Sequence, residues 1–208
     1  MKSSLSLMLS ALVLPAMLLV GCGGDSGSND LTVSVNDLSG TAKDMTKPAC
    51  TAVATWPSNN VEVLGGPTSS APFDFVTIGH AQKTAGSQTD ALSVELWHTA
   101  GAPSAIGTVM LAATDTYNTC DTCLLLDENY DPTMGFGDTG FFGRAGTITI
   151  TKADRTPAAG MMAVSGTNVN LVEWDFMNDK PVTNGKCYDV AAFSMSGSYS
   201  NPDGGTDM

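Results

Sequence analysis

Four cysteines in the body of the chain are the residues best suited to chemistry. Cys120 and Cys123 form a C-x-x-C pair in "NTCDTCLLLDE", whereas Cys50 and Cys187 are distant singles. A reactive thiol of this spacing needs a helix N-terminus or a nearby cation, and a four-cysteine zinc site needs closely spaced ligand pairs. The residues after Cys123 follow no helical pattern, carry no nearby Lys or Arg, and match a zinc site weakly. We therefore expect disulfides, as in an exported protein.

The four cysteines permit three disulfide pairings. We favour a local Cys120–Cys123 bridge together with a Cys50–Cys187 bridge that ties the early part of the domain to its last strand. The two crossed pairings stay open at this point. The long bridge would contribute about 4–5 kcal/mol by removing chain entropy from the unfolded state.

An acidic loop is the best candidate for ligand binding. In "DENYDPTMGFGD", Asp127, Asn129 and Asp131 alternate, and Asp138 falls at the twelfth position. Alternating oxygen ligands over twelve residues are typical of an EF-hand calcium loop, but Pro132 replaces its glycine and no helices flank it. The EF-hand itself is therefore rejected. A calcium site of another construction and a plain solvated loop both remain, and the solvated loop is favoured.

Other patterns that carry chemistry are weak. Trp97 lies on the polar side of its expected strand beside Glu95, so it could stack on a sugar or a partner, or lie beneath a loop. There is no G-x-S-x-G elbow, phosphate-binding loop or H-E-x-x-H pair, and the two histidines, His80 and His98, show no metal spacing. We expect no catalytic residues and no enzymatic activity.

The front of the chain has the form of an export signal. Lys2 supplies a positive head, and residues 5–20 form an apolar stretch that is short for a membrane-spanning helix. The stretch ends in "LVGC", whose last residue is Cys22. These four residues resemble the lipobox of bacterial lipoproteins.

The lipobox resemblance implies a membrane anchor. It implies that the Cys22 thiol is alkylated with diacylglycerol, that residues 1–21 are removed, and that the new amino terminus is acylated. Two or more acyl chains hold a protein stably to a bilayer. Gly23 in place of aspartate, by analogy with the sorting rule of some lipoproteins, implies the outer membrane of a Gram-negative cell envelope. The following residues, up to position 30, form a glycine- and serine-rich flexible tether.

Composition limits the partners. The 208-residue chain has 9 Lys and Arg, 21 Asp and Glu and a net charge of −12. Removal of residues 1–21 takes away one lysine and no acid, which leaves eight bases against 21 acids and a net charge of −13. This charge argues against nucleic acid and against electrostatic binding to anionic lipid. The membrane, reached through lipid, is the expected partner, and a protein or glycan partner stays unidentified.

Alternating apolar residues predict strands through a single β-rich domain at residues 31–199, with a disordered tail at 200–208. The expected strands are 31–35, 61–64, 73–78, 92–98, 106–112, 122–127, 146–152, 168–176 and 187–195. A change of apolar parity at Leu171–Val172 predicts a β-bulge there, and Asn184-Gly185 predicts a turn. This pattern indicates an all-β fold, an antiparallel β-sandwich or a barrel-like sheet; one short helix near 40–47 is the alternative.

These observations lead to a functional expectation. We expect a surface-tethered, non-catalytic envelope lipoprotein with a structural or interaction role and no obligatory cofactor. A calcium- or carbohydrate-binding β module is the first alternative, with its site at the acidic loop or at Trp97. An enzyme is the second alternative.

Overall fold

A computed structural model describes residues 49–57, 60–85, 87–102, 106–156 and 159–200. The leader, Cys22, the tether, the expected strand at 31–35, the alternative helix and residues 201–208 of the tail lie outside these residues. The described strands are β1 (Thr51–Val53), β2 (Val61–Pro67), β3 (Phe73–Ala85), β4 (Gln88–Thr99), β5 (Gly107–Leu111), β6 (Thr122–Glu128), β7 (Thr139–Ala153), β8 (Met161–Asp175), β9 (Lys180–Pro181) and β10 (Cys187–Ser198). The described residues contain no helix, so the all-β prediction is confirmed.

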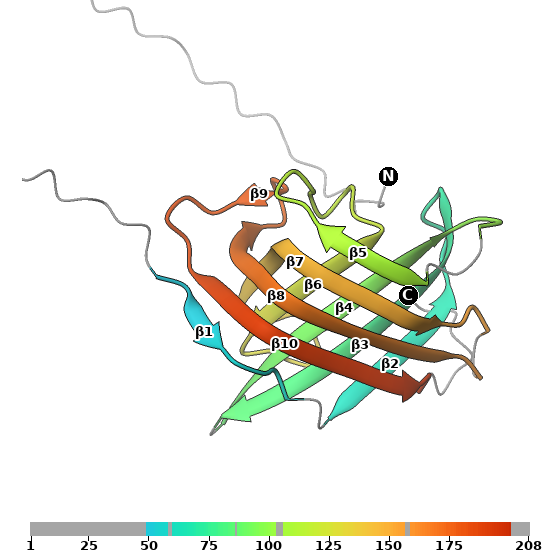
Figure 1. Cartoon of the computed structure of the whole chain (residues 1–208), viewed down its shortest axis with the longest axis horizontal. Coiled ribbons are helices and arrows are strands. Elements are labelled where there is room, and N and C mark those ends of the chain that lie inside the picture. The colour runs from blue at the N-terminus through green and yellow to red at the C-terminus, as the bar shows by residue number, and fades with distance from the viewer. Residues whose placement is uncertain (1–48, 58–59, 86, 103–105, 157–158, 201–208) are drawn as a thin grey trace, which may run out of the picture. The chain divides into compact units, whose positions relative to one another are not determined.

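The strands form one sheet in the order β1-β10-β8-β7-β6-β4-β3-β2 (Figure 1). Neighbouring strands are antiparallel, except that β1 runs parallel to β10. Strand β7 is long enough to pair with β6 through its first residues and with β5 through Gly146–Ile150. The short strand β9 pairs with the end of β8. The long antiparallel hairpins β3–β4 and β7–β8 therefore form most of the sheet.

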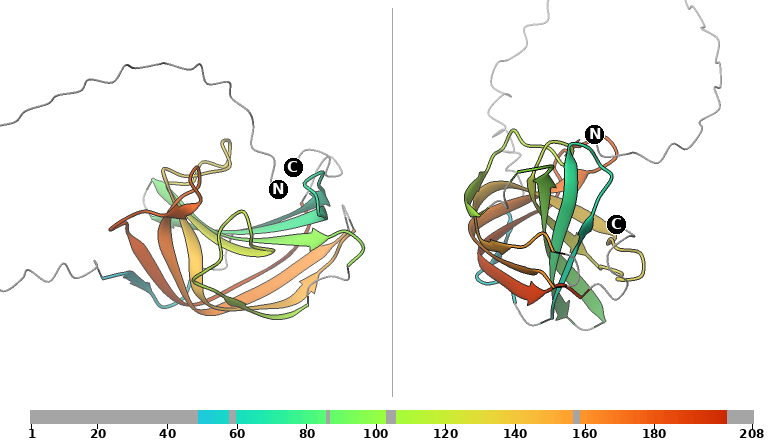
Figure 2. Two further views of the ribbon diagram at one scale, coloured as in Figure 1. Left: turned by 90° about the horizontal axis from the view of Figure 1, so that it is seen from above. Right: turned by 90° about the vertical axis from the view of Figure 1, so that its right-hand side faces the viewer.

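The sheet is curved and is not closed (Figure 2). Strands β10 and β2, near opposite ends of the strand order, approach each other where the chain leaves β10. There the Ser200 amide donates a hydrogen bond to the Val63 carbonyl of β2 at 2.8 Å. The neighbouring Tyr199 ring fills a slot beside two glycines: a Cβ on Gly65 or Gly160 would lie 2.6 or 2.7 Å from its Cδ2 atom. Tyr199 thus packs against the seam between the first and last parts of the fold.

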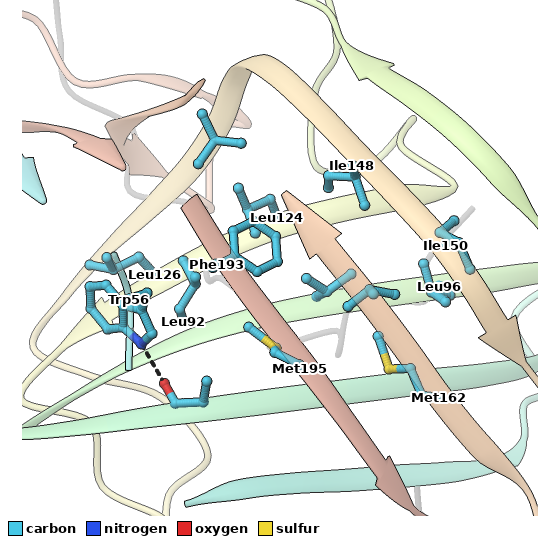
Figure 3. Packing of buried hydrophobic residues seen from close by; sticks show 14 of the residues in the cluster. Trp56, Leu92, Leu96, Leu124, Leu126, Ile148, Ile150, Met162, Phe193 and Met195 are labelled. Atoms are coloured by element: carbon cyan, nitrogen blue, oxygen red, sulfur yellow. Dashed lines mark hydrogen bonds between the residues drawn. The ribbon is translucent and has the colours of Figure 1, made fainter. Parts of the chain in front are cut away.

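One main hydrophobic cluster lies on the inner, concave side of the sheet (Figure 3). Strand β4 contributes Leu92, Val94 and Leu96 to it, in the period-2 pattern that the sequence predicts. Trp56, which follows β1, is 1% exposed, and its indole Nε1–H donates to the Ala81 carbonyl at 2.8 Å. The hydrogen bond satisfies the polar end of a buried tryptophan, as burial of this side chain requires.

A second, smaller cluster covers part of the outer face of the sheet. Its buried members are Cys120, Cys123, Phe142 and Trp174. Strands β4, β6, β7 and β8 are therefore packed on both faces in this region.

The structure refines the bulge predicted at Leu171–Val172 of β8. Val172 and Trp174 are apolar because they face the outer cluster. The pairing of β8 with β10 is regular there, whereas its pairing with β7 is irregular between Gly143 and Ala145, which lie opposite Leu171 and Asn170. The inward positions also shift between Val164 and Val169, around Asn168, whose φ is 51°. The pairing of β8 with β7 is irregular at that point, opposite Gly146, whose φ is 112°. The pairing of β8 with β7 therefore has two irregularities in this region, one opposite Leu171, where the sequence predicts a bulge, and one at Asn168.

The favoured disulfide pairing is confirmed. Cys50 is bonded to Cys187 across 137 residues, and Cys120 is bonded to Cys123. The long bridge joins the residue before β1 to the first residue of β10, so it holds β1 against the sheet. The short bridge lies in the outer cluster, at the start of β6.

Candidate functional site

A cavity of about 420 Å³ lies on the outer face of the sheet; we call it the outer pocket. Its floor comes from β4, β6 and β7, and its walls come from the loops that precede β6, follow β6 and follow β8. The lining residues are Glu95, Tyr117, Leu125, Asp127, Gly135, Phe136, Gly137, Gly140 and Phe176. The volume falls within the range of small-molecule sites in proteins.

Glu95 is the most buried acid of the pocket. Because Val94 and Leu96 point into the inner core, the residue between them must face outward, and the outer cluster and loops leave it 8% exposed. Its carboxylate accepts a hydrogen bond from the Trp97 indole Nε1 at 2.9 Å and another from the Tyr117 hydroxyl at 3.3 Å. These donors compensate part of the cost of burying a carboxylate.

Tyr117 is held in the pocket wall by Asp179. One carboxylate oxygen of Asp179 accepts the Tyr117 amide at 2.9 Å and the Trp174 indole Nε1 at 3.1 Å; the other accepts the Asn118 amide at 3.2 Å. Burial acts to raise the pKa of Asp179, but hydrogen bonds such as these outweigh it and lower that pKa. The Tyr117 ring meets the Phe176 ring edge to face, with centroids 5.2 Å apart. Asp179 therefore fixes two loops that are far apart in sequence.

The pocket is electronegative. Burial raises the pKa of the Tyr117 hydroxyl far above its usual range, and the nearby charges of Glu95, Asp127 and Asp179 raise it further. Burial also raises the pKa of Asp127, although the Gly137 amide, which donates to its Oδ1 at 3.3 Å, acts in the opposite direction. The pocket thus disfavours additional negative charge.

Exposed apolar side chains lie on two of the loops that form the pocket walls, and two of them, Phe136 and Phe176, line the pocket. Met134 and Phe136 are 60% and 55% exposed on the loop after β6, and Phe176 and Met177 are 37% and 97% exposed on the loop after β8. A Cβ on Gly140 would lie 2.6 Å from the Phe176 Cε2 atom, so a glycine is needed there to accommodate this ring. Exposed apolar side chains gathered beside a cavity are typical of an interaction site.

The structure distributes the four residues predicted as calcium ligands among different partners. Asp127 faces the outer pocket, the Asn129 side-chain amide donates to Asp138 Oδ2 at 3.0 Å, and Asp131 accepts the Thr133 amide at 2.7 Å. No group of three or more His, Cys, Asp or Glu among the described residues is placed to hold a metal ion. The geometry therefore adds no support to the calcium hypothesis, which stays a prediction.

Trp97, predicted as a ligand-binding residue, lies beside the pocket and not in its lining. It is partly buried against the outer cluster, and its ring lies 5.5 Å from the ring of Phe73. Its indole N–H reaches Glu95, which does line the pocket. Trp97 thus contributes to the site through the carboxylate that it orients.

Three aromatic lining residues were missed at the level of sequence: Tyr117, Phe136 and Phe176. Tyr117 and Phe136 lie in turn-rich loops, where period-2 alternation provides no information, and Phe176, expected at the end of strand 168–176, lies just beyond β8. The only local signal was a bulky ring inside a turn-rich segment that a solvated loop would not need.

The two histidines lie away from the outer pocket. His98 is buried, its Nε2 lies 3.2 Å from Thr77 Oγ1, and its Nδ1 has no hydrogen-bond partner within the described residues. His80 Nδ1 lies 2.7 Å from Ser93 Oγ. Burial lowers the pKa of both rings, so both are neutral near pH 7.

Comparisons with known proteins identify no relative: no family model, no curated protein sequence and no solved structure matches the chain. Among the described residues, no helix has the length and apolar character needed to cross a membrane.

Proposed function

We propose that the protein is a non-catalytic lipoprotein of the cell envelope whose β domain binds a ligand in the outer pocket. The carrying observation is the pocket itself, in which the buried acid Glu95 lies beneath a rim of exposed apolar side chains. A purely structural domain would gain no stability from leaving Phe136 and Met177 in water.

The pocket is built by elements that hold it firmly. Asp179 ties Tyr117 to the loop after β8, and the Cys120–Cys123 bridge closes the segment that leads into β6. A site held in place before binding loses less entropy when its ligand arrives. This rigidity supports recognition of a defined ligand.

The membrane anchor rests on the sequence pattern that ends at Cys22. The positive head, the apolar stretch, the lipobox and the tether occur in the order that bacterial lipoproteins share. The two disulfides agree with an oxidising compartment outside the cytoplasm. We propose the outer membrane as the location.

A carbohydrate is one candidate ligand of this pocket. Phe136 and Phe176 expose their rings beside the carboxylates of Glu95 and Asp127, and aromatic rings with polar neighbours are able to stack on a sugar. Binding of a carbohydrate is compatible with the proposed non-catalytic role.

The test uses the lipidated chain, purified in detergent from membranes. Intact-mass analysis is expected to show Cys22 at the amino terminus with its acyl chains, and Cys22→Ser is expected to abolish the modification. NMR of the tryptophan indoles then reports binding from a glycan panel and a panel of small amines. A pocket ligand is expected to shift the Trp97 signal, which bonds to Glu95, and to leave Trp56 in the inner core unchanged.

Matched variants decide whether binding occurs in the pocket. Phe136→Ala removes an exposed wall residue, whereas Met110→Ala removes an apolar side chain that is also exposed but lies on β5. Loss of binding in the first variant alone supports the proposal. If no member of either panel shifts Trp97, ligand binding in the pocket is rejected; if Cys22 carries no lipid, the anchor is rejected.

A further inference from the structure

We infer that the ligand of the outer pocket is a small organic cation, an ammonium group that carries apolar substituents. This inference rests on the proposed function and names its ligand class. The juxtaposition that carries it is two carboxylates, Glu95 and Asp127, on the floor of a cavity whose walls include three aromatic rings.

Charge is the first step of the argument. None of the nine lining residues is Lys, Arg or His, whereas two are acids. Two donors to Glu95, an indole N–H and a phenol O–H, are neutral, so these two solvate its carboxylate without cancelling its charge. A cation that enters the pocket gains the attraction of both acids in a partly desolvated site.

The aromatic walls form the second step. Tyr117, Phe136 and Phe176 surround the same cavity, and an aromatic face attracts a cation through its quadrupole. Substituted ammonium groups suit such walls because their carbon shell also buries apolar surface. A neutral sugar would stack on the rings but would gain nothing from the charges of Glu95 and Asp127.

The electrostatic field in the pocket agrees with this preference. Besides burial, the charges of Glu95 and Asp127 raise the pKa of the Tyr117 hydroxyl, because they disfavour a phenolate there. The same charges favour a cation at the same place. The net charge of −12 over the whole chain also raises the local concentration of cations near the protein.

The experiment compares a cation with its neutral isostere on the lipidated protein. Choline and 3,3-dimethylbutan-1-ol have nearly the same shape and differ in charge. Choline is expected to shift the Trp97 indole signal and to bind at least about tenfold more tightly than the alcohol, a difference within the reach of cation–π and charge interactions. Its affinity is expected to fall as NaCl is raised, because salt screens charge.

The variants use equal charge changes at two nearby positions, Asp127 at the end of β6 and Asp131 in the loop that follows. Asp127→Asn keeps an acceptor for the Gly137 amide but removes a pocket charge, and about a tenfold loss of choline affinity is expected. Asp131→Asn removes a charge from outside the lining, and less than about a twofold change is expected. Phe176→Ala tests the wall without touching an acid. Glu95→Gln is avoided because its amide would meet the Trp97 or Tyr117 donor.

One further probe distinguishes two sources of the cation, a lysine side chain of a partner protein and a free small molecule. N-acetyl-lysine methylamide presents the side chain of a partner protein, whereas choline represents a free small molecule. Tighter binding of either probe identifies the source, and both results support the inference.

Two outcomes overturn it. Equal binding of choline and the neutral alcohol refutes charge recognition, as does absence of choline binding to the folded wild-type protein. If a glycan then shifts Trp97 while choline does not, the inference fails and the proposed function stands. If neither class binds in the pocket, both fail.

Discussion

The unequal loops closed by the two disulfides lead to a quantitative prediction. The Cys50–Cys187 bridge spans 137 residues, and the Cys120–Cys123 bridge spans three. Chain-entropy stabilisation from the long loop is about 5 kcal/mol at 25 °C, whereas the short loop yields about 1.6 kcal/mol. Cys50→Ala/Cys187→Ala should therefore lower the free energy of unfolding by about 3 kcal/mol more than Cys120→Ala/Cys123→Ala.

Loss of packing does not explain a larger loss of stability for the long-bridge variant. Cys187, Cys120 and Cys123 are all buried, so truncation to alanine removes buried sulfur in both double variants. Strand β1, however, has only three paired positions with β10 and follows directly after Cys50. Loss of the long bridge should also loosen β1 and the Trp56 amide, which donates to the Ala192 carbonyl at 2.9 Å.

Urea denaturation monitored by circular dichroism measures both variants against the wild type. The long-bridge variant should also show a larger dependence of unfolding free energy on urea, because its unfolded chain is less constrained. The short-bridge variant should lose affinity in the outer pocket, since the pocket residue Tyr117 lies in the segment directly before this bridge. Equal losses of stability, or a larger loss for the short bridge, would refute the loop-entropy reasoning.

Two further predictions concern buried positions. Gly65→Ala should cost about 1–3 kcal/mol, because its Cβ would lie 2.6 Å from the Tyr199 Cδ2 atom. In a Tyr199→Ala background the same change should cost clearly less; an unchanged cost in urea titrations would exclude this contact as the cause. Burial lowers the folded-state pKa of His80 and His98 below 6.5, so the unfolded chain binds protons more readily. Unfolding free energy should hence be maximal above pH 6.5 and fall toward pH 5.5, by up to about 1.4 kcal/mol per pH unit for each histidine. Replacement of both by glutamine should flatten this decline, whereas increased wild-type stability on acidification would contradict it.

Local sequence was sufficient to predict the longer strands but not β1 and β9, because period-2 alternation records which side of a strand is buried only over several residues. Residues 92–98 and 146–152 alternate clearly, and both lie in strands whose inward side chains enter the inner core. The Asn184-Gly185 turn is likewise a local feature: Asn184 has a φ of 58°, and the Gly185 amide donates to the Val182 carbonyl. Such features depend on neighbouring residues alone.

The same reasoning was incomplete where both faces of a strand are covered. At Val172 and Trp174 the sequence pattern resembles a bulge, but the outer cluster explains their apolar character. A strand pattern does not reveal which loop will cover it, because that depends on contacts between distant segments. The further irregularity at Asn168 was recognisable only from the register with β7.

By itself, the sequence determined the longer strands, the cysteines available for disulfides and the acidic, aromatic composition of the loops. Only the tertiary structure decided that Glu95, Asp127 and Phe176 line one cavity while Asp131 and Asp138 have other partners. The physical reason is the distance along the chain of the contacts that build the site. The bond from Tyr117 to Asp179, across 62 residues, forms only after the sheet has brought their loops together.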